Sequence, residues 1–376
     1  MKTLRNIVTL AVIGSMLIFA GCEEEENIQT VDKDEAVETL NQNSQEMASD
    51  FDQMATTEGM ESMEVLTALS QKDNPFAKKK MVGPESVLQS IEKTLRPSNN
   101  EMVKRLGDQP FDFQAHTGTY TWQEEGKWLV DTETPSDAIV IEFPTDTIDT
   151  PIENNAVLTL SNYEETMVLD SAGNERYVPV RLQALLEVDG DKKMEVDWLL
   201  EIQEMDDGSQ MVSSLDATIY LKPFTYNLAL TQNSLSASIS KDEVARTLMS
   251  VNLNVTFMDN MEDIKEVEGN VQARNLNFKG WAKPYAMKPE NIDRDQVKST
   301  GDLVDYYNQQ IDLALYTFDQ GNKIADVKFF ESNATENEWP MELRFVFKDD
   351  STRPVMDYFN NLVTKLQEHL QRYNVS

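Results

Sequence analysis

The alternation of apolar and polar residues between about residues 107 and 350 constrains the fold of this chain most. The stretch MEVDWLLEI, residues 194–202, places Met194, Val196 and Trp198 on one side of an extended chain and acidic residues between them. A period of two is the pattern of a β-strand with one buried face. Similar stretches recur through the region, so the sequence predicts a β-rich body of about a dozen strands.

Short acidic and glycine-containing segments separate these strands. Glu125-Gly126, Asp189-Gly190-Asp191 and Asp206-Asp207-Gly208 each stand between two alternating stretches. Glycine and aspartate are residues that tight turns require. Strands joined by tight turns pair antiparallel with their neighbours, so the sequence predicts a mostly antiparallel meander.

Helical periodicity appears at both ends of the chain. Apolar residues recur at spacings of three and four from Val37 to Met54, which predicts helices in an N-terminal region at 36–106. Further stripes predict a helix near 302–315 and a C-terminal helix at 351–376 that packs on the sheet. The predicted class is α+β, a large antiparallel sheet backed by N-terminal and C-terminal amphipathic helices. A short coiled coil is the alternative for the N-terminal stripe.

The first residues have the order of an export signal. Basic residues precede an apolar run at 7–19, which is too short to span a bilayer of about 30 Å comfortably. Phe19-Ala20-Gly21-Cys22 then resembles the lipobox of bacterial lipoproteins. The resemblance implies that residues 1–21 are a signal peptide, that cleavage occurs before Cys22, and that the Cys22 thiol carries a diacylglycerol.

The chain has one cysteine, so Cys22 has no partner for an internal disulfide, which is the alternative use of an exported thiol. Two or three acyl chains on one residue hold a domain at a membrane far more firmly than one. Residues 22–35 are acidic and polar, which predicts a flexible tether. Glu23 to Glu26 resemble the acidic export signal of Bacteroidota lipoproteins, which implies an outer-membrane protein exposed at the cell surface. The alternative is the periplasmic face of that membrane.

Composition limits the partners of the chain. The formal net charge is −33, which disfavours nucleic acid and anionic lipid as ligands. The apolar content of 40% is enough for a real core. We therefore expect a membrane contact through Cys22, and a protein or glycan partner for the folded body. The oligomeric state stays open.

Residues typical of catalysis are scarce. The two histidines, His116 and His369, stand in no known catalytic motif, and the single cysteine is the predicted anchor. We therefore predict no catalytic site, no cofactor and no metal site, and a protein that is not an enzyme. Carboxylate pairs cannot be ranked among 66 acidic residues. Calcium at the Asp-Gly segments is an alternative to their use as turns, but their spacing differs from that of known calcium loops.

Two tryptophans, Trp122 and Trp128, flank the first predicted hairpin. They are candidates for stacking on a sugar ring. The alternative, which we favour, is an aromatic pair across two strands that stabilises the sheet.

Several middle strands carry small uncharged residues on their second face: Asn227, Ser236, Ser238, Asn252, Asn254 and Thr256. An exposed face in so acidic a chain would be expected to carry glutamate and lysine. We therefore predict that another layer covers this face. The alternative is a neutral docking surface.

Three functions are compatible with these features. The first is a lipid-anchored cell-envelope lipoprotein with a non-enzymatic binding or structural role. The second is a carrier of a lipid or other apolar ligand between sheet and helices. The third is a glycan-binding or glycan-hydrolysing surface protein. A carrier requires an enclosed apolar cavity, and a hydrolase requires a polar cleft with two convergent carboxylates.

Overall fold

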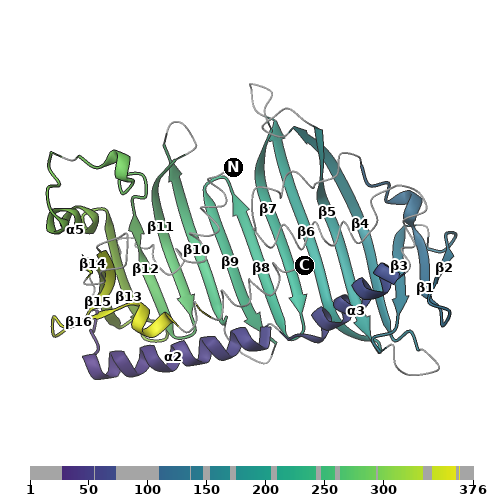
Figure 1. Cartoon of the computed structure of the whole chain (residues 1–376), viewed down its shortest axis with the longest axis horizontal. Helices are drawn as coiled ribbons and strands as arrows, with labels where there is room; N and C mark the ends of the chain where they lie inside the picture. Colours follow the sequence, from purple (N-terminus) through teal and green to yellow (C-terminus); the bar gives the residue numbers. More distant parts are fainter. Residues whose placement is uncertain are drawn as a thin grey trace. The chain divides into compact units, whose positions relative to one another are not determined.

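The computed structural model of this chain describes most of the β-rich body and parts of both helical ends (Figure 1). The described residues are 28–54, 56–72, 110–135, 137–146, 153–169, 175–204, 210–242, 247–258, 263–293, 295–332, 341–360 and 364. Cys22, residues 73–106 of the predicted helical region, and His369 lie outside these ranges.

The chain divides into two compact units. The first, the β1–β8 unit, contains Thr56–Gln232 and Ile239–Arg246. Its elements are α3 (Glu58–Lys72), the 3-10 helix η3 (Gln114–His116), β1 (Gly118–Trp122), β2 (Trp128–Asp131), β3 (Ala138–Phe143), β4 (Ala156–Leu169), β5 (Glu175–Val188), β6 (Asp191–Glu204), β7 (Gln210–Leu221) and β8 (Phe224–Thr231).

The second, the β10–β16 unit, contains Met1–Ala55, Asn233–Ser238 and Thr247–Ser376. Its elements are α2 (Lys33–Met54), β10 (Met249–Phe257), β11 (Ile264–Ala273), β12 (Leu276–Ala282), the 3-10 helix η4 (Pro289–Asn291), α5 (Thr300–Asn308), β13 (Ile311–Thr317), β14 (Lys323–Glu331), β15 (Met341–Val346) and β16 (Thr352–Pro354). Strand β9 (Ser234–Lys241) contributes residues to both units.

The strands of the described residues form a 16-stranded sheet in the order β16-β15-β14-β13-β12-β11-β10-β9-β8-β7-β6-β5-β4-β3-β1-β2. This order follows the sequence except at one edge, where β1 lies between β3 and β2. There β1 runs parallel to β3, with Thr119 opposite Val140. The predicted α+β class, with a large and mostly antiparallel meander sheet, is confirmed.

The predicted turns lie between paired strands where the structure describes them. Glu125-Gly126 joins β1 to β2, and Asp189-Gly190 joins β5 to β6. Asp189 and Gly190 have φ values of 53° and 74°. Positive φ at both central residues is the geometry of the hairpin turn that matches strand twist. Asp206-Asp207-Gly208 lies outside the described residues.

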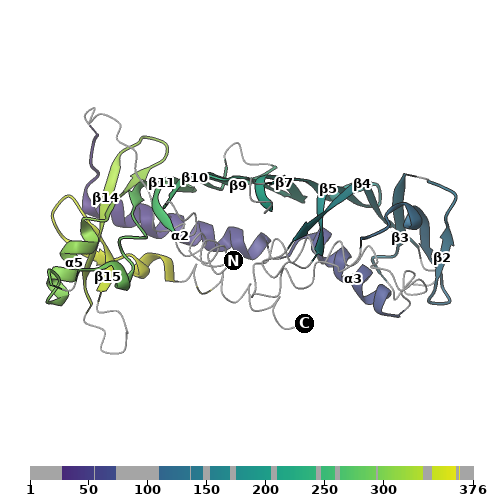
Figure 2. The ribbon, with the colours of Figure 1, turned by 90° about the horizontal axis from the view of Figure 1, so that it is seen from above.

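The core of the β1–β8 unit lies between α3 and one face of its strands, which we call the inner face (Figure 2). Leu66 and Leu69 of α3 are buried against inner-face residues such as Leu186 and Trp198. Full burial of a leucine side chain contributes about 2 kcal/mol. The opposite face, which we call the outer face, carries the polar members of the same alternation.

Helix α2 packs on the sheet of the β10–β16 unit and does not need a partner helix. Ala36, Leu40 and Met47 belong to one buried cluster with strand residues of this unit. Ser44, which interrupts the apolar stripe, is also buried, and its Oγ donates to the carbonyl oxygen of Tyr358 at 2.5 Å. The prediction that this helix packs against the body is confirmed. Within the described residues, no helix has the length and apolar character needed to cross a membrane.

The predicted flexible segment at 22–35 is wrong for residues 31–35. The sequence predicts a flexible segment at 22–35, but Val31 donates its backbone N–H to the carbonyl of Lys323 at 3.0 Å, and α2 begins at Lys33. The reason is Val31 itself, whose side chain is buried in the core.

The helix predicted near 302–315 is also shorter. Helix α5 ends at Asn308, and Ile311–Thr317 form β13. Ile311 and Leu315 are four residues apart, as on one face of a helix, but Leu313 between them makes the segment alternate as a strand does. The segment adopts the strand. At the C-terminus a helix begins at Met356, and Val355, Tyr358 and Phe359 are buried in the core of this unit.

Candidate binding face on strands β4–β8

The alternation of β6 determines which side chains reach the outer face. Val196, Trp198 and Leu200 are buried on the inner face, whereas Asp197 and Leu199 are exposed on the other side. Because successive side chains of a strand point to opposite faces, the neighbouring strands supply outer-face residues at the positions opposite these two.

Two rows of outer-face residues cross the strands. The first row follows the register Gln183 opposite Asp197, Asp197 opposite Thr218, and Thr218 opposite Asn227. The second row contains Arg181, Leu199, Asp216 and Ala229 in the same strands. We call these eight residues, together with Asn162, the outer polar face. The face combines amide, hydroxyl, carboxylate and guanidinium groups with one large apolar side chain.

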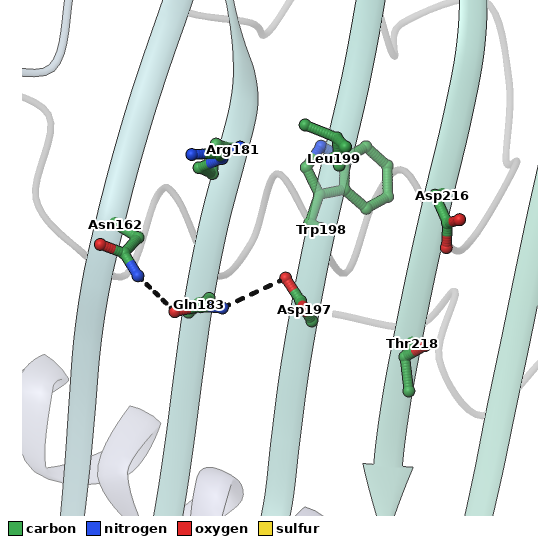
Figure 3. Close-up of a pocket in the computed structure, with 8 residues that line it drawn as sticks. All are labelled: Asn162, Arg181, Gln183, Asp197, Trp198, Leu199, Asp216 and Thr218. Atoms are coloured by element: carbon green, nitrogen blue, oxygen red, sulfur yellow. Dashed lines mark hydrogen bonds between the residues drawn. The ribbon is translucent and has the colours of Figure 1, made fainter.

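Asn162 extends the first row onto β4 through a local irregularity of the strand. The register of β4 against β5 shifts between Ser161 and Glu164, and Asn162 has a φ of 52°. Asparagine is among the residues that adopt this left-handed conformation most readily. The irregularity leaves the Asn162 side chain exposed on the outer face, where its amide meets Gln183 (Figure 3).

Hydrogen bonds join the members of the first row (Figure 3). Asn162 Nδ2 donates to Gln183 Oε1, and Gln183 Nε2 donates to Asp197 Oδ1 at 3.5 Å. Further along the row, Thr218 Oγ1 donates to Asn227 Oδ1 at 3.1 Å. Such bonds orient the amides, and each oxygen keeps acceptor capacity for a further donor.

The second row has a different character. Leu199 lies between Arg181 and Asp216 in the register, and 39% of its surface is exposed. Arg181 Nη1 is 3.9 Å from Glu164 Oε1, and both side chains are more than half exposed. An ion pair of that length in water contributes little stability, so the guanidinium keeps donors for a ligand.

The members of the two rows on β5, β6 and β7, together with Asn162, line an open hollow of about 470 Å³. Its lining residues are Asn162, Arg181, Gln183, Asp197, Trp198, Leu199, Asp216 and Thr218. Trp198 contributes only marginally, because its ring is buried on the inner face and its Nε1 donates to the Pro179 carbonyl at 3.1 Å. The hollow is therefore open to solvent and mainly polar.

This arrangement suits binding better than hydrolysis. A carboxyl group that acts as a general acid needs an apolar enclosure, and both Asp197 and Asp216 are exposed. The hollow holds no histidine and no aromatic ring that faces solvent. What it offers is a wide array of hydrogen-bond donors and acceptors.

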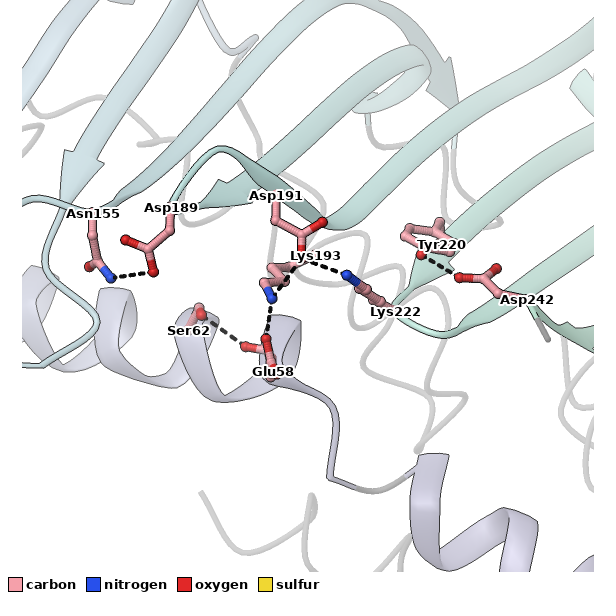
Figure 4. Close-up of polar contacts among 9 residues, drawn as sticks. All are labelled: Glu58, Ser62, Asn155, Asp189, Asp191, Lys193, Tyr220, Lys222 and Asp242. Atoms are coloured by element: carbon pink, nitrogen blue, oxygen red, sulfur yellow. Dashed lines mark hydrogen bonds and ion pairs between the residues drawn. The ribbon is translucent and has the colours of Figure 1, made fainter.

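Helix α3 is fixed beneath this region by an ion-pair cluster (Figure 4). Lys193 Nζ pairs with Glu58 of α3 and lies 3.0 Å from Asp191 Oδ2, which Lys222 Nζ approaches to 2.5 Å. The bond to Glu58, followed by the bond to Asp191, raises the pKa of Lys193. The bonds from Lys222 and Lys193 lower the pKa of Asp191.

The same cluster bears on the calcium alternative. Asp191 belongs to the acidic turn Asp189-Gly190-Asp191, and two lysines already neutralise its carboxylate. Asp189 Oδ2 accepts from Asn155 Nδ2 at 3.4 Å. Across the described residues, no three metal-ligating side chains lie together in a group that could hold an ion.

Trp122 and Trp128, the predicted stacking candidates, face each other across β1 and β2. Their ring centroids are 5.0 Å apart with an interplanar angle of 71°. Trp122 is 4% exposed and belongs to the core, so its ring is not accessible to a sugar. The geometry is that of an edge-to-face pair that stabilises the hairpin.

His116 also belongs to the core rather than to a site. Its ring stacks on Phe111 at a centroid distance of 5.2 Å, and its carbonyl oxygen accepts from the Tyr120 hydroxyl at 2.9 Å. The side chain is 3% exposed. The ring therefore packs on Phe111 in the interior of the β1–β8 unit.

The small uncharged residues of the middle strands are mostly exposed, contrary to the prediction that a further layer covers them. Asn227, Ser236, Asn252, Asn254 and Thr256 are all exposed, and only Ser238 is partly buried. In the β10–β16 unit, Ser236 Oγ donates to Asn252 Oδ1 at 2.9 Å. The alternative, a neutral surface available to a partner, agrees with these exposures.

Comparison with known proteins provides no relative. The chain matches no family model, no curated protein and no solved structure.

Proposed function

We propose that this protein is a lipid-anchored, non-enzymatic binding protein of the bacterial cell envelope, and that the outer polar face of β4–β8 is its binding surface. The anchor in this proposal is Cys22, after removal of residues 1–21. The lipobox resemblance at Phe19-Ala20-Gly21-Cys22 and the absence of any second cysteine support it. The acidic residues that follow favour the outer leaflet of the outer membrane.

One observation supports the binding role most directly. The members of the outer polar face are exposed or half-buried, yet none of them is the lysine or glutamate that usually keeps an exposed sheet soluble. Instead, four of the five residues of the first row, Asn162, Gln183, Thr218 and Asn227, present amides or a hydroxyl, and the fifth, on β6, is Asp197. Amides and hydroxyls recognise neutral polar partners through hydrogen bonds.

The two alternatives find less support. A carrier needs an enclosed apolar cavity, whereas the hollow on β4–β7 is open and lined by polar groups. A glycan hydrolase needs one carboxyl shielded from water, whereas Asp197 and Asp216 are exposed. We therefore rank binding first, transport of an apolar ligand second and hydrolysis third.

The anchor is tested by mass spectrometry of the protein isolated from its native host. We expect a mature chain that begins at Cys22 and carries acyl chains. A Cys22→Ser variant should lose the acyl mass and keep residues 1–21. Protease treatment of intact cells then separates the two orientations, because only a surface-exposed body is digested. An unmodified Cys22 in the native protein would remove the basis for the envelope assignment.

A further inference from the structure

The arrangement of the outer polar face also indicates the class of its ligand. We infer that the ligand is a neutral polysaccharide whose chain runs across strands β4–β8, with successive sugar units over successive strands. This inference rests on the proposed function, because it assigns a ligand to the same face.

The rows supply the groups that sugar hydroxyls require. A sugar hydroxyl both donates and accepts, so a face for sugars needs both kinds of group. The side-chain amides of Gln183 and Asn162 each contain hydrogen-bond donors and an acceptor. Asp197 and Asp216 provide further acceptors, and Arg181 provides further donors. Adjacent hydroxyls of one sugar can therefore be bound by different members of the face.

The spacing of the rows suits a linear polymer. Neighbouring strands lie about 4.8 Å apart, so equivalent side chains in a row repeat at that interval. This interval is close to the length of one pyranose unit in an extended chain. The first row continues over five strands, from Asn162 on β4 to Asn227 on β8. A polymer can therefore repeat its contacts from strand to strand.

Leu199 completes the match with an apolar contact. A pyranose ring has an apolar face of C–H groups and a polar rim of hydroxyls. Leu199 is 39% exposed and lies between Arg181 and Asp216 in the second row. A ring placed over Leu199 buries its C–H face there while its rim reaches the charged groups on each side.

Charge excludes anionic ligand classes. Asp197 and Asp216 lie in the hollow of a chain with a formal net charge of −33, which opposes anionic polysaccharides and nucleic acids. Charge does not exclude a basic polypeptide, because two carboxylates outnumber the Arg181 guanidinium in the hollow; the polylysine gel below tests that ligand. A neutral chain meets no repulsion.

The hollow also fits a glycan better than a protein partner. Stable protein interfaces concentrate their energy in a few buried aromatic or arginine anchors that fill pockets. Leu199 is the exposed large apolar side chain of this hollow, and no exposed aromatic ring lines it. A volume of about 470 Å³ lies within the range of small-ligand sites and accommodates a short segment of a polysaccharide.

Affinity electrophoresis of the chain from Glu23 onward, without the acylated Cys22, tests the inference. The chain is run through native gels that contain dextran, laminarin, mannan, polygalacturonate or polylysine. We expect at least one of the three neutral polysaccharides to retard it, and polygalacturonate to have no effect. The double variant Gln183→Ala/Asp197→Ala should bind the same polysaccharide about tenfold more weakly, since it loses two hydrogen-bonding groups. Thermal unfolding verifies that each variant is folded.

The matched control is Gln203→Ala, which removes an exposed glutamine from the same β6 strand outside the hollow. It should bind as the unmodified chain does. Equal binding by the double variant would show that the outer polar face is not the site, which contradicts the proposed function as well. Retardation by polylysine alone, lost in the double variant, would keep the face as a binding surface but overturn the neutral-glycan assignment. Failure of all three neutral polysaccharides would also overturn that assignment.

Discussion

The guanidinium of Arg274 donates from Nε to Oδ2 of Asp50 at 2.6 Å and so connects the β11–β12 turn to the end of α2. Both side chains are largely buried, with exposures of 18% and 9%. Helix α2 has no basic residue in its last turn, where the negative end of the helix dipole disfavours a carboxylate. Arg274 supplies the missing positive charge from the sheet.

Replacing Arg274 with methionine should therefore destabilise the β10–β16 unit strongly. The change leaves the Asp50 carboxylate buried without its partner, which typically costs about 3 kcal/mol of unfolding free energy. Urea denaturation measures the loss. Arg344→Met is the control, since Arg344 pairs with Glu342 in a more exposed position and should cost about 1 kcal/mol or less. If Asp50→Asn combined with Arg274→Met costs the full sum of the single changes, the two residues do not act as a pair.

Gly269 is the position in β11 where any side chain should be most damaging. A Cβ there would lie 1.9 Å from the carbonyl oxygen of Asn252, which belongs to the paired strand β10 and cannot move without breaking the sheet. Gly269→Ala should cost more than about 3 kcal/mol, the upper range for overpacking. Gly321→Ala is the control, because its φ is 68° and no atom lies within 4 Å of the added Cβ. It should cost about 1 kcal/mol from backbone strain alone. Equal losses in the two variants would contradict the steric argument.

The hairpins are predictable from sequence because each turn shows two signals: residues that favour tight turns, and an interruption of the apolar–polar alternation of the flanking strands. Asp189-Gly190 shows both signals, and its flanking strands alternate cleanly. The alternation alone therefore assigns the two faces of β6 correctly. The end of the helix predicted near 302–315 is not predictable in this way, because Ile311 fits both a helical stripe that follows Tyr307 and an alternation with Leu313 and Leu315. The choice between them is made by pairing of β13 with β12, a contact between distant residues that one sequence does not reveal.

The binding face is only partly predictable, because it depends on register. Counting back from the Asp189-Gly190 turn gives the wrong partners, since the register of β5 against β6 shifts between Leu186 and Glu187. Asn162 reaches the face through a second irregularity, in β4. The signal in the sequence is compositional, namely the uncharged residues on the second face of the middle strands. This pattern identifies Asn227 as a surface residue, but it does not predict that Asn227 lies in one row with Gln183 and Asp197.

Gly59 determines how closely α3 approaches β6. A Cβ at this position would lie 2.9 Å from the backbone carbonyl oxygen of Lys193. Alanine raises helix propensity by about 1 kcal/mol over glycine, but displacement of a strand carbonyl costs more. We expect a net loss of about 1 kcal/mol for Gly59→Ala, with faster hydrogen exchange throughout α3. Thr67→Ala, an exposed change on the same helix, should leave exchange unchanged or slow it. Slower exchange in Gly59→Ala would mean that the contact with Lys193 does not limit α3.

Glu165 should make the stability of the β1–β8 unit depend on pH. Its Oε2 accepts from the Tyr163 hydroxyl at 2.7 Å, and Tyr163 stacks on Phe113. Burial raises the pKa of Glu165 and outweighs the opposing hydrogen bonds from Tyr163 and the Phe111 backbone. A carboxyl whose pKa is higher in the folded state favours folding while it is protonated. That contribution is complete below the ordinary value of 4.5 and is lost as the pH rises through the folded-state pKa.

Glu165→Gln removes the charge and keeps an acceptor for Tyr163. We expect the variant to unfold at a higher temperature than the unmodified chain at pH 7, with the difference shrinking as the pH falls below the ordinary carboxyl value. Thermal unfolding across that interval measures both trends. Glu164→Gln, the exposed neighbour, should change the unfolding free energy by less than about 0.5 kcal/mol at pH 7. An effect of Glu165→Gln that is equal at both ends of the pH range would show that burial of the charged carboxylate does not limit stability there.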